Sequence, residues 1–200
     1  MRYSEYIKIE ELHNLQCLVS QANEKDELTF IIVHQISELL MRIVHSELDA
    51  FIQLGKHNPK NIVNSLAKIV CAFEQLNGQL KLCSFVSPEG FAAIRSTVYP
   101  ATAEESEQFS LFFNRVSGPL IGEHKILSTV LQGTIDVAKA AQKKDLINSI
   151  GHLRRLVNEW KEQHIALAEN FLGTGTGATS SGADYLRKKA KSDVFPALHL

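Results

Sequence analysis

Apolar residues recur at helical spacing along almost the whole chain, and only five prolines interrupt its 200 residues. Repeats of three and four residues place apolar side chains on one face of a helix, whereas a half-buried strand needs strict alternation. The pattern therefore predicts an all-α protein, a bundle of long antiparallel helices with shorter ones between them. Long helices are expected at 26–54, from 59 to about 78 or slightly beyond, and at 145–172, and shorter ones at 88–98, 102–117 and 120–142.

Capping residues set the expected helix ends. Asn58 before Pro59 and Ser87 before Pro88 are typical helix starts, and Thr102 with Glu105 forms a capping box.

Three stripes of mainly apolar residues then form the expected core. On the first long helix the stripe is Phe30, His34, Ser37, Met41, Val44, Leu48 and Phe51; on the second Ile62, Leu66, Ile69, Phe73, Leu76 and Leu80; on the last Leu153, Val157, Trp160, His164, Leu167 and Phe171.

Composition excludes several classes of protein. The net charge of −1 and the pI near 6.7 provide no basic surplus for binding nucleic acid. Three cysteines without a CxxC spacing argue against a disulfide framework or a zinc site, so we expect Cys17, Cys71 and Cys83 to be buried apolar residues. We find neither a signal peptide nor an apolar run of bilayer length. The expectation is one cytoplasmic domain, residues 1–200, with no membrane partner.

Two histidines, His34 and His164, lie in the middle of apolar stripes, where an imidazole is either a hydrogen-bonded core residue or a ligand. A di-iron site in a bundle needs two Glu-x-x-His motifs, and Glu10 to His13 supplies one, more simply read as an exposed turn. His45 and Asp49 are spaced for a solvated side-chain contact.

Two further features have open interpretations. The segment GTGTGATSSGADYL, residues 173–186, lacks the context of a nucleotide-binding loop. It is either a surface turn or a loop whose amides close over the polar end of a substrate. Arg95, among small and apolar neighbours, either reaches solvent or awaits a carboxylate that its planar guanidinium matches.

Five blocks in order make the chain resemble the tryptophan 2,3-dioxygenase family of haem-dependent oxygenases. The blocks are YSEYIKIEEL, KDELTFIIVHQISELL, SPEGFAAIRSTVYPATAEESEQF, EQHIALAENFLGTGTGATSSGADYL and VFPALHL. They resemble the family's N-terminal segment, its Asp-Glu-x-x-Phe-Ile-x-x-His-Gln signature, its substrate-arginine segment, its haem-ligand helix with the glycine-rich loop, and its C-terminal Phe-Pro-x-Leu motif.

The resemblance implies roles for individual residues. His164 would be the axial ligand of a b-type haem iron, and His34 the distal histidine that accepts a hydrogen bond from an indole N–H. Phe30 and Phe91 would contact the substrate, while Arg95 and Thr176, in the loop 173–184, would hold its carboxylate and ammonium. In the arm of residues 1–10, Tyr3, Tyr6 and Ile7 match positions that reach a neighbouring subunit's pocket, which implies a homotetramer or homodimer.

The activity implied is insertion of dioxygen across the indole C2–C3 bond of L-tryptophan or a close analogue, giving an N-formylkynurenine-type product. Some residues depart from the family pattern: Phe91 and Phe109 stand where tyrosines are usual, Leu40 replaces a tryptophan and Lys25 a histidine. The stretch between Phe109 and His164 is also short. Two alternatives follow, a haem-dependent monooxygenase of another aromatic amino acid and a catalytically silent haem- or indole-binding protein.

Overall fold

A computed structural model describes residues 1–54, 59–99, 106–140, 144–172, 187 and 193–199 of the chain. Within these residues the regular structure is helical throughout, with eight helices and no strand, as the spacing of apolar residues predicts. In chain order they are α1 (Tyr3–Tyr6), α2 (Ile9–His13), α3 (Glu24–Leu54), α4 (Pro59–Cys83), α5 (Pro88–Val98), α6 (Glu107–Val116), α7 (Gly122–Ala140) and α8 (Lys144–Leu172).

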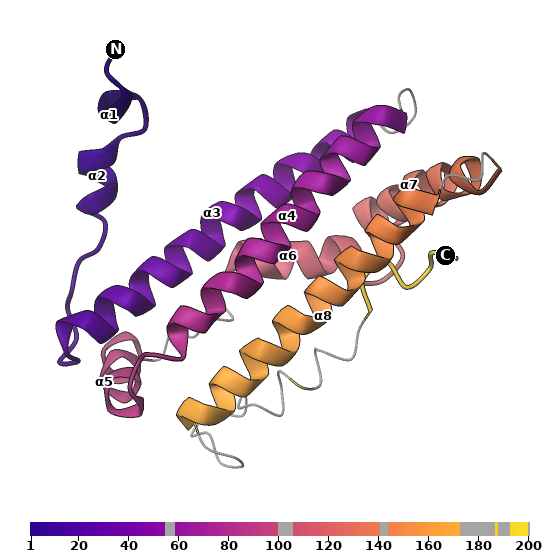
Figure 1. Cartoon of the computed structure of the whole chain (residues 1–200). Coiled ribbons are helices and arrows are strands. Elements are labelled where there is room, and N and C mark those ends of the chain that lie inside the picture. Colours follow the sequence, from indigo (N-terminus) through magenta and orange to yellow (C-terminus); the bar gives the residue numbers. More distant parts are fainter. Residues whose placement is uncertain (55–58, 100–105, 141–143, 173–186, 188–192, 200) are drawn as a thin grey trace.

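Three long helices form the body of the molecule. Figure 1 shows α3, α4 and α8 lying side by side, with α5 at the end where α3 begins and α8 ends, and with α6 and α7 behind them. The core fills the space between these helices and includes the whole expected stripe of α4, the α3 stripe from Met41 to Phe51 and the α8 stripe from Leu153 to Trp160. The other stripe residues of α3 and α8, His34 and His164 among them, are half-buried. The largest fully buried side chains of the core are Met41, Leu48, Phe51, Ile62, Ile69, Phe73, Leu76, Phe112, Leu127, Leu131, Ile135 and Ile150.

Helix α3 is also long and apolar enough, by length and composition, to cross a bilayer. A core helix of a soluble protein meets the same criterion, and α3 carries fully buried Met41 and Val44 against the rest of the bundle. Some of its apolar side chains stay exposed, however, among them Leu39 and Ile43, at 54% and 47%.

The helix boundaries agree with the capping signals at one site and differ at another. Ser87 caps α5, because its side chain accepts a hydrogen bond from the Gly90 N–H. Helix α6, by contrast, begins at Glu107, and its N-cap is Ser106, which accepts from the Phe109 N–H. The expected start at the Thr102–Glu105 box is therefore placed too early, and those two residues lie outside the part that the structure describes.

A buried carboxylate joins the start of α5 to the start of α3. Asp26 accepts hydrogen bonds from the Ser87 hydroxyl at 2.6 Å, the Ser87 N–H at 3.2 Å and the Asn23 side-chain amide at 2.7 Å. Gly90 belongs to the same contact, since a Cβ there would lie 2.2 Å from Asp26 Oδ2. The junction sets α5 against α3 without room for a larger side chain, so it fixes the helix that carries Phe91 and Arg95.

We expect Asp26→Asn to weaken the fold at neutral pH and to flatten its acid dependence. The Ser87 hydroxyl is the main cause that lowers the pKa of Asp26 below its ordinary value of 3.8. The charged form is thus favoured in the folded state, and the stability it contributes is present above pH 3.8 and lost as pH falls through the lower folded pKa. Urea unfolding at pH 7 should show a loss of about 1 to 3 kcal/mol, the usual effect of weakening hydrogen bonds to a charged group.

The same unfolding measurement below pH 4 should show a smaller difference between Asp26→Asn and the unmodified chain. Asp136→Asn is the matched control, because Asp136 is exposed on α7 and should change neither curve. A constant difference at all pH values would contradict a role for the Asp26 charge.

The C-terminal segment is fastened to the bundle by one arginine. Arg154 on α8 donates hydrogen bonds to the carbonyl oxygens of Val194 at 2.9 Å and Phe195 at 2.5 Å. Val194, Phe195 and Leu198 are buried in the core, and the Phe195 N–H donates to the Val116 carbonyl at the end of α6. The final VFPALHL block thus completes the hydrophobic core next to α6 and α8.

Two expectations about polar residues were wrong. Cys83 is buried, but Cys17 and Cys71 are exposed. His45 and Asp49 make more than a solvated contact, because both bind Arg115, whose side chain is 4% exposed. His45 also contacts the Gln108 carbonyl, so this group attaches α6 to α3. The partner residue lies 66 positions further along the chain, which is why spacing within α3 gave no sign of it.

Candidate functional site

His34 lies in the first half of α3 with its ring fixed by its own helix. Its Nδ1 lies 2.7 Å from the Phe30 carbonyl oxygen, which only accepts hydrogen bonds, so Nδ1 carries the proton. Burial lowers the pKa of His34 more than this hydrogen bond and the charge of Glu38 raise it. At neutral pH the imidazole is therefore uncharged, with the Nε2 lone pair available to accept a hydrogen bond.

His164 lies in the second half of α8, which runs antiparallel to α3 in this part of the bundle (Figure 1). Phe91 of α5 joins the two helices that carry the histidines, because its ring contacts Phe30 on α3 and Phe171 on α8. The pKa of His164 is lowered to about 4, mainly by burial and to a lesser extent by the charge of His34. His164 is thus neutral at physiological pH, as an imidazole that binds a metal must be.

Each histidine packs on the aromatic ring one helical turn before it. Phe30 lies with its ring centroid 4.0 Å from that of His34, and Trp160 stacks on His164 at 5.1 Å with an angle of 15° between the rings. This i, i+4 spacing brings side chains together on one face of a helix. A phenylalanine from another helix then supports each pair: Phe91 of α5 meets Phe30 edge-on, and Phe109 of α6 stacks on Trp160.

Helix α5 bridges the site between α3 and α8. Besides its contact with Phe30, the Phe91 ring stacks on Phe171 near the end of α8, with centroids 4.4 Å apart and an angle of 10°. Arg95 lies one turn after Phe91 on the same face of α5 and is half-buried. Its guanidinium makes no hydrogen bond or ion pair with another residue in the described ranges.

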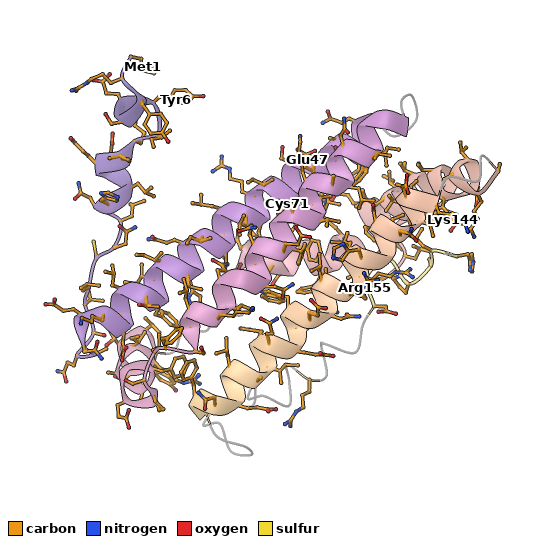
Figure 2. All side chains as sticks on the ribbon, viewed as in Figure 1. Met1, Tyr6, Glu47, Cys71, Lys144 and Arg155 are labelled. Carbon is orange, nitrogen blue, oxygen red and sulfur yellow. The ribbon has the colours of Figure 1, made fainter. Side chains whose placement is uncertain are left out.

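The arm predicted to reach another subunit extends away from the bundle. In Figures 1 and 2, α1 and α2 stand apart from the long helices, and the labelled Tyr6 lies on this arm. Tyr3 and Tyr6 are 76% and 73% exposed, and Ile7 is 37% exposed. The base of the arm is held, since Glu27 of α3 accepts hydrogen bonds from the Val19 and Ser20 N–H groups. Glu10 and His13 are exposed on α2.

The sequence is similar to known proteins of one family. The family model for tryptophan 2,3-dioxygenase matches residues 1–124. The tryptophan 2,3-dioxygenase of Herpetosiphon aurantiacus is 34% identical, with 99% of this chain and 96% of the relative covered. The chain belongs to the tryptophan 2,3-dioxygenase family. The protein of the same name from a Bradyrhizobium strain is 24% identical over 99% of this chain and 90% of its own.

Membership of the tryptophan 2,3-dioxygenase family makes the protein an oxygenase and confirms the resemblance seen in the five sequence blocks. The alignment with the Herpetosiphon enzyme extends over 253 residues, although this chain has 200. The relative therefore contains segments that have no counterpart here.

The structure brings some of the expected site residues together and leaves others apart. Phe30, His34 and Phe91 form one cluster, and α8 joins it through Phe171, two turns after His164. Arg95 is on the helix that closes this cluster. Tyr3, Tyr6 and Ile7 do not join it within one chain, and Thr176 lies outside the described residues.

Sequence reasoning did not identify two aromatic residues, Trp160 and Phe171, as part of the site. Trp160 and Phe171 were assigned only to the apolar stripe of the last helix, yet Trp160 stacks on His164 and Phe171 on Phe91. The signal for Trp160 was present, because an aromatic residue precedes each histidine by four positions. No local signal identified Phe171, whose partner lies on another helix.

The residues of this site fit the haem that the tryptophan 2,3-dioxygenase family uses. His164 is a neutral imidazole on an apolar helix face, without a hydrogen bond to the other residues that the structure describes. Beside it, the Trp160 indole N–H is a buried donor with no partner in the same residues. An aromatic, largely apolar surface with a neutral imidazole suits a flat macrocycle that contains iron.

Proposed function

We propose that the protein is a haem-dependent dioxygenase that inserts dioxygen across the indole C2–C3 bond of L-tryptophan or a close indole analogue. The product is of the N-formylkynurenine type. The observation that supports this most strongly is that two neutral histidines, His34 on α3 and His164 on α8, lie on helices joined by the ring contacts of Phe91. His34 presents a lone pair for a substrate N–H, and His164 makes no hydrogen bond to the other residues that the structure describes. His164 is the axial ligand of a b-type haem in this proposal.

Each residue of the proposed site then has a defined role. His34 accepts a hydrogen bond from the indole N–H at Nε2, because its Nδ1–H already donates to the Phe30 carbonyl. This contact orients the substrate and needs no proton transfer. Phe30 and Phe91 supply an apolar wall for the indole ring, and their packing excludes water from it. Arg95 pairs with the amino-acid carboxylate through its planar guanidinium.

Haem, when bound, supplies the activation of dioxygen, and the protein supplies position and a dry environment. Thr176, in the glycine-rich segment that follows α8, is proposed to contact the substrate's carboxylate and ammonium groups. Its place in the sequence, shortly after the helix that carries His164, supports this. We also place the enzyme in the cytoplasm.

The first test is the absorption spectrum of the haem-reconstituted, reduced protein with and without L-tryptophan under oxygen. A Soret band that shifts with tryptophan, together with repeated turnover to a formylkynurenine product, is the expected result. A Soret band without product would contradict the dioxygenase assignment and direct the search to other aromatic amino acids. Failure to take up haem would refute the assignment of His164.

Tyr3, Tyr6 and Ile7 are proposed to complete the pocket of a neighbouring subunit in a homodimer or homotetramer. Their exposure on an arm that leaves the bundle supports this, because it makes these side chains accessible to another copy of the chain. Exposed Leu39 and Ile43 on α3 give a second reason to expect association between copies.

Deletion of residues 1–8 should therefore reduce activity more than stability. All eight lost residues are exposed, so the urea midpoint should change little. The kcat/KM for L-tryptophan should fall by about tenfold or more, since an incomplete pocket positions its substrate poorly. Light scattering of the same sample reports its oligomeric state. A fully active monomeric truncation would refute the shared pocket.

A further inference from the structure

Trp160 is buried at the site, but no hydrogen bond of its indole N–H to a described residue accounts for this position. It is the only tryptophan in the sequence and is 9% exposed. Its N–H has no acceptor among the residues that the structure describes. A buried indole usually pairs this group. The contacts it does make are through the ring, with His164 on its own helix and Phe109 on α6.

The geometry of these contacts forms a column of three rings. Phe109 and Trp160 are 4.8 Å apart between centroids with an angle of 13°, and Trp160 and His164 are 5.1 Å apart with an angle of 15°. Phe113 adds a fourth ring, 6.3 Å from Trp160. Three nearly parallel planes leave the imidazole little freedom to rotate about its Cβ–Cγ bond without losing stacking contact.

Helix α6, which provides Phe109, is held firmly against α3. Glu38 accepts hydrogen bonds from the Ser106 hydroxyl at 2.6 Å and the Gln108 side-chain amide at 2.8 Å. Arg115 binds His45 and Asp49 further along the same pair of helices. The ring that supports Trp160 therefore rests on an element with fixed polar attachments at both ends.

We infer that Trp160, supported by Phe109, is a positioning residue that holds the His164 imidazole in the orientation in which it binds the cofactor. The inference rests on the proposed role of His164 as iron ligand. Metal-binding histidines are ordinarily oriented by a hydrogen bond from their second nitrogen. His164 has no such bond to the other described residues, and a stacked indole restricts its ring in place of one.

Two substitutions at one position separate stacking from other effects. Trp160→Phe keeps an aromatic face and removes the N–H, whereas Trp160→Leu keeps an apolar side chain and removes the ring. The rate of haem release to an excess of apomyoglobin should rise about tenfold or more in Trp160→Leu, the usual effect of losing a group that orients a metal ligand. It should stay close to the wild-type rate in Trp160→Phe.

Spectroscopy supplies a readout that a loss of general stability does not move. The ferric electron paramagnetic resonance spectrum should show altered rhombicity in Trp160→Leu and not in Trp160→Phe, because rhombicity reports the orientation of the axial imidazole. Leu153→Ala is the matched control, since it removes buried contacts from the same helix two turns away. It should lower the urea midpoint and leave haem release and the spectrum unchanged.

Phe109→Leu is the second variant, for use if Trp160→Leu does not fold, and it should change both readouts in the same direction. Wild-type haem release and spectrum in Trp160→Leu or Phe109→Leu would overturn the inference. Equal changes in Trp160→Leu and Trp160→Phe would overturn it as well, because stacking would not be the cause. A failure of the proposed function gives a different result from these two outcomes: if His164 is not the iron ligand, His164→Ala will retain haem.

Discussion

Replacement of His164 by alanine is expected to abolish stoichiometric binding of haem. The substitution removes the proposed axial ligand, a neutral imidazole held among apolar and aromatic side chains. Residues that only orient a ligand already contribute about 10- to 100-fold to metal affinity, so loss of the ligand itself should exceed about a hundredfold. The haem-to-protein ratio of reconstituted protein after gel filtration, measured by the pyridine haemochrome method, tests this.

His152→Ala provides the control for this substitution. His152 lies on the same helix, three turns before His164, and is likewise half-buried. It should retain one haem per chain. Circular dichroism of His164→Ala should show an intact helical bundle, so that failure to bind haem is separated from failure to fold. Full haem occupancy in a folded His164→Ala would refute the ligand assignment.

Replacement of Arg95 by alanine is expected to cost the enzyme most of its efficiency toward amino-acid substrates. The half-buried guanidinium has no described partner and faces the same side of α5 as Phe91. Loss of a charge-assisted pair with the substrate carboxylate should cost about 2 to 3 kcal/mol, or about 30- to 150-fold in kcat/KM. Steady-state kinetics with L-tryptophan measures this effect.

The comparison between substrates makes the Arg95 prediction specific. An indole without a carboxylate should lose much less efficiency in Arg95→Ala than L-tryptophan does. Arg95→Lys should recover only part of the loss, because an ammonium group cannot bind a carboxylate in two places through a planar fork. Arg42→Ala, at an exposed arginine of α3, is the control and should leave kinetics unchanged. An unchanged KM in Arg95→Ala would show that the residue does not bind the carboxylate.

Local patterns predicted the helices well because each signal acts within a few residues. The expected stripe residues from Met41 to Phe51 and from Ile62 to Leu80 are all buried. Ser87 caps α5 as its position before Pro88 indicated. Helix α4 continues beyond Gly78 to Cys83, where packing against α3 and α8 outweighs the weak helix preference of glycine.

Local patterns failed where the deciding contact lies far along the chain. Arg115 converts His45 and Asp49 into an attachment site for α6, although these two residues by themselves resemble an ordinary surface pair. Cys17 and Cys71 are exposed because their positions face away from the core, which residue type alone does not determine. The start of α6 differs for a related reason: Ser106 caps the helix and also binds Glu38 on α3.

The sequence by itself determined the helical class, the core stripes, the family and the two histidines on which the proposed chemistry depends. These properties are periodic or local, or are carried by motifs of contiguous residues. Only the tertiary structure decided what surrounds those histidines. The stacks of Trp160 with Phe109 and of Phe91 with Phe171 each join helices that are distant in sequence. Such contacts depend on how the helices cross, and that is fixed by the packing of the whole bundle.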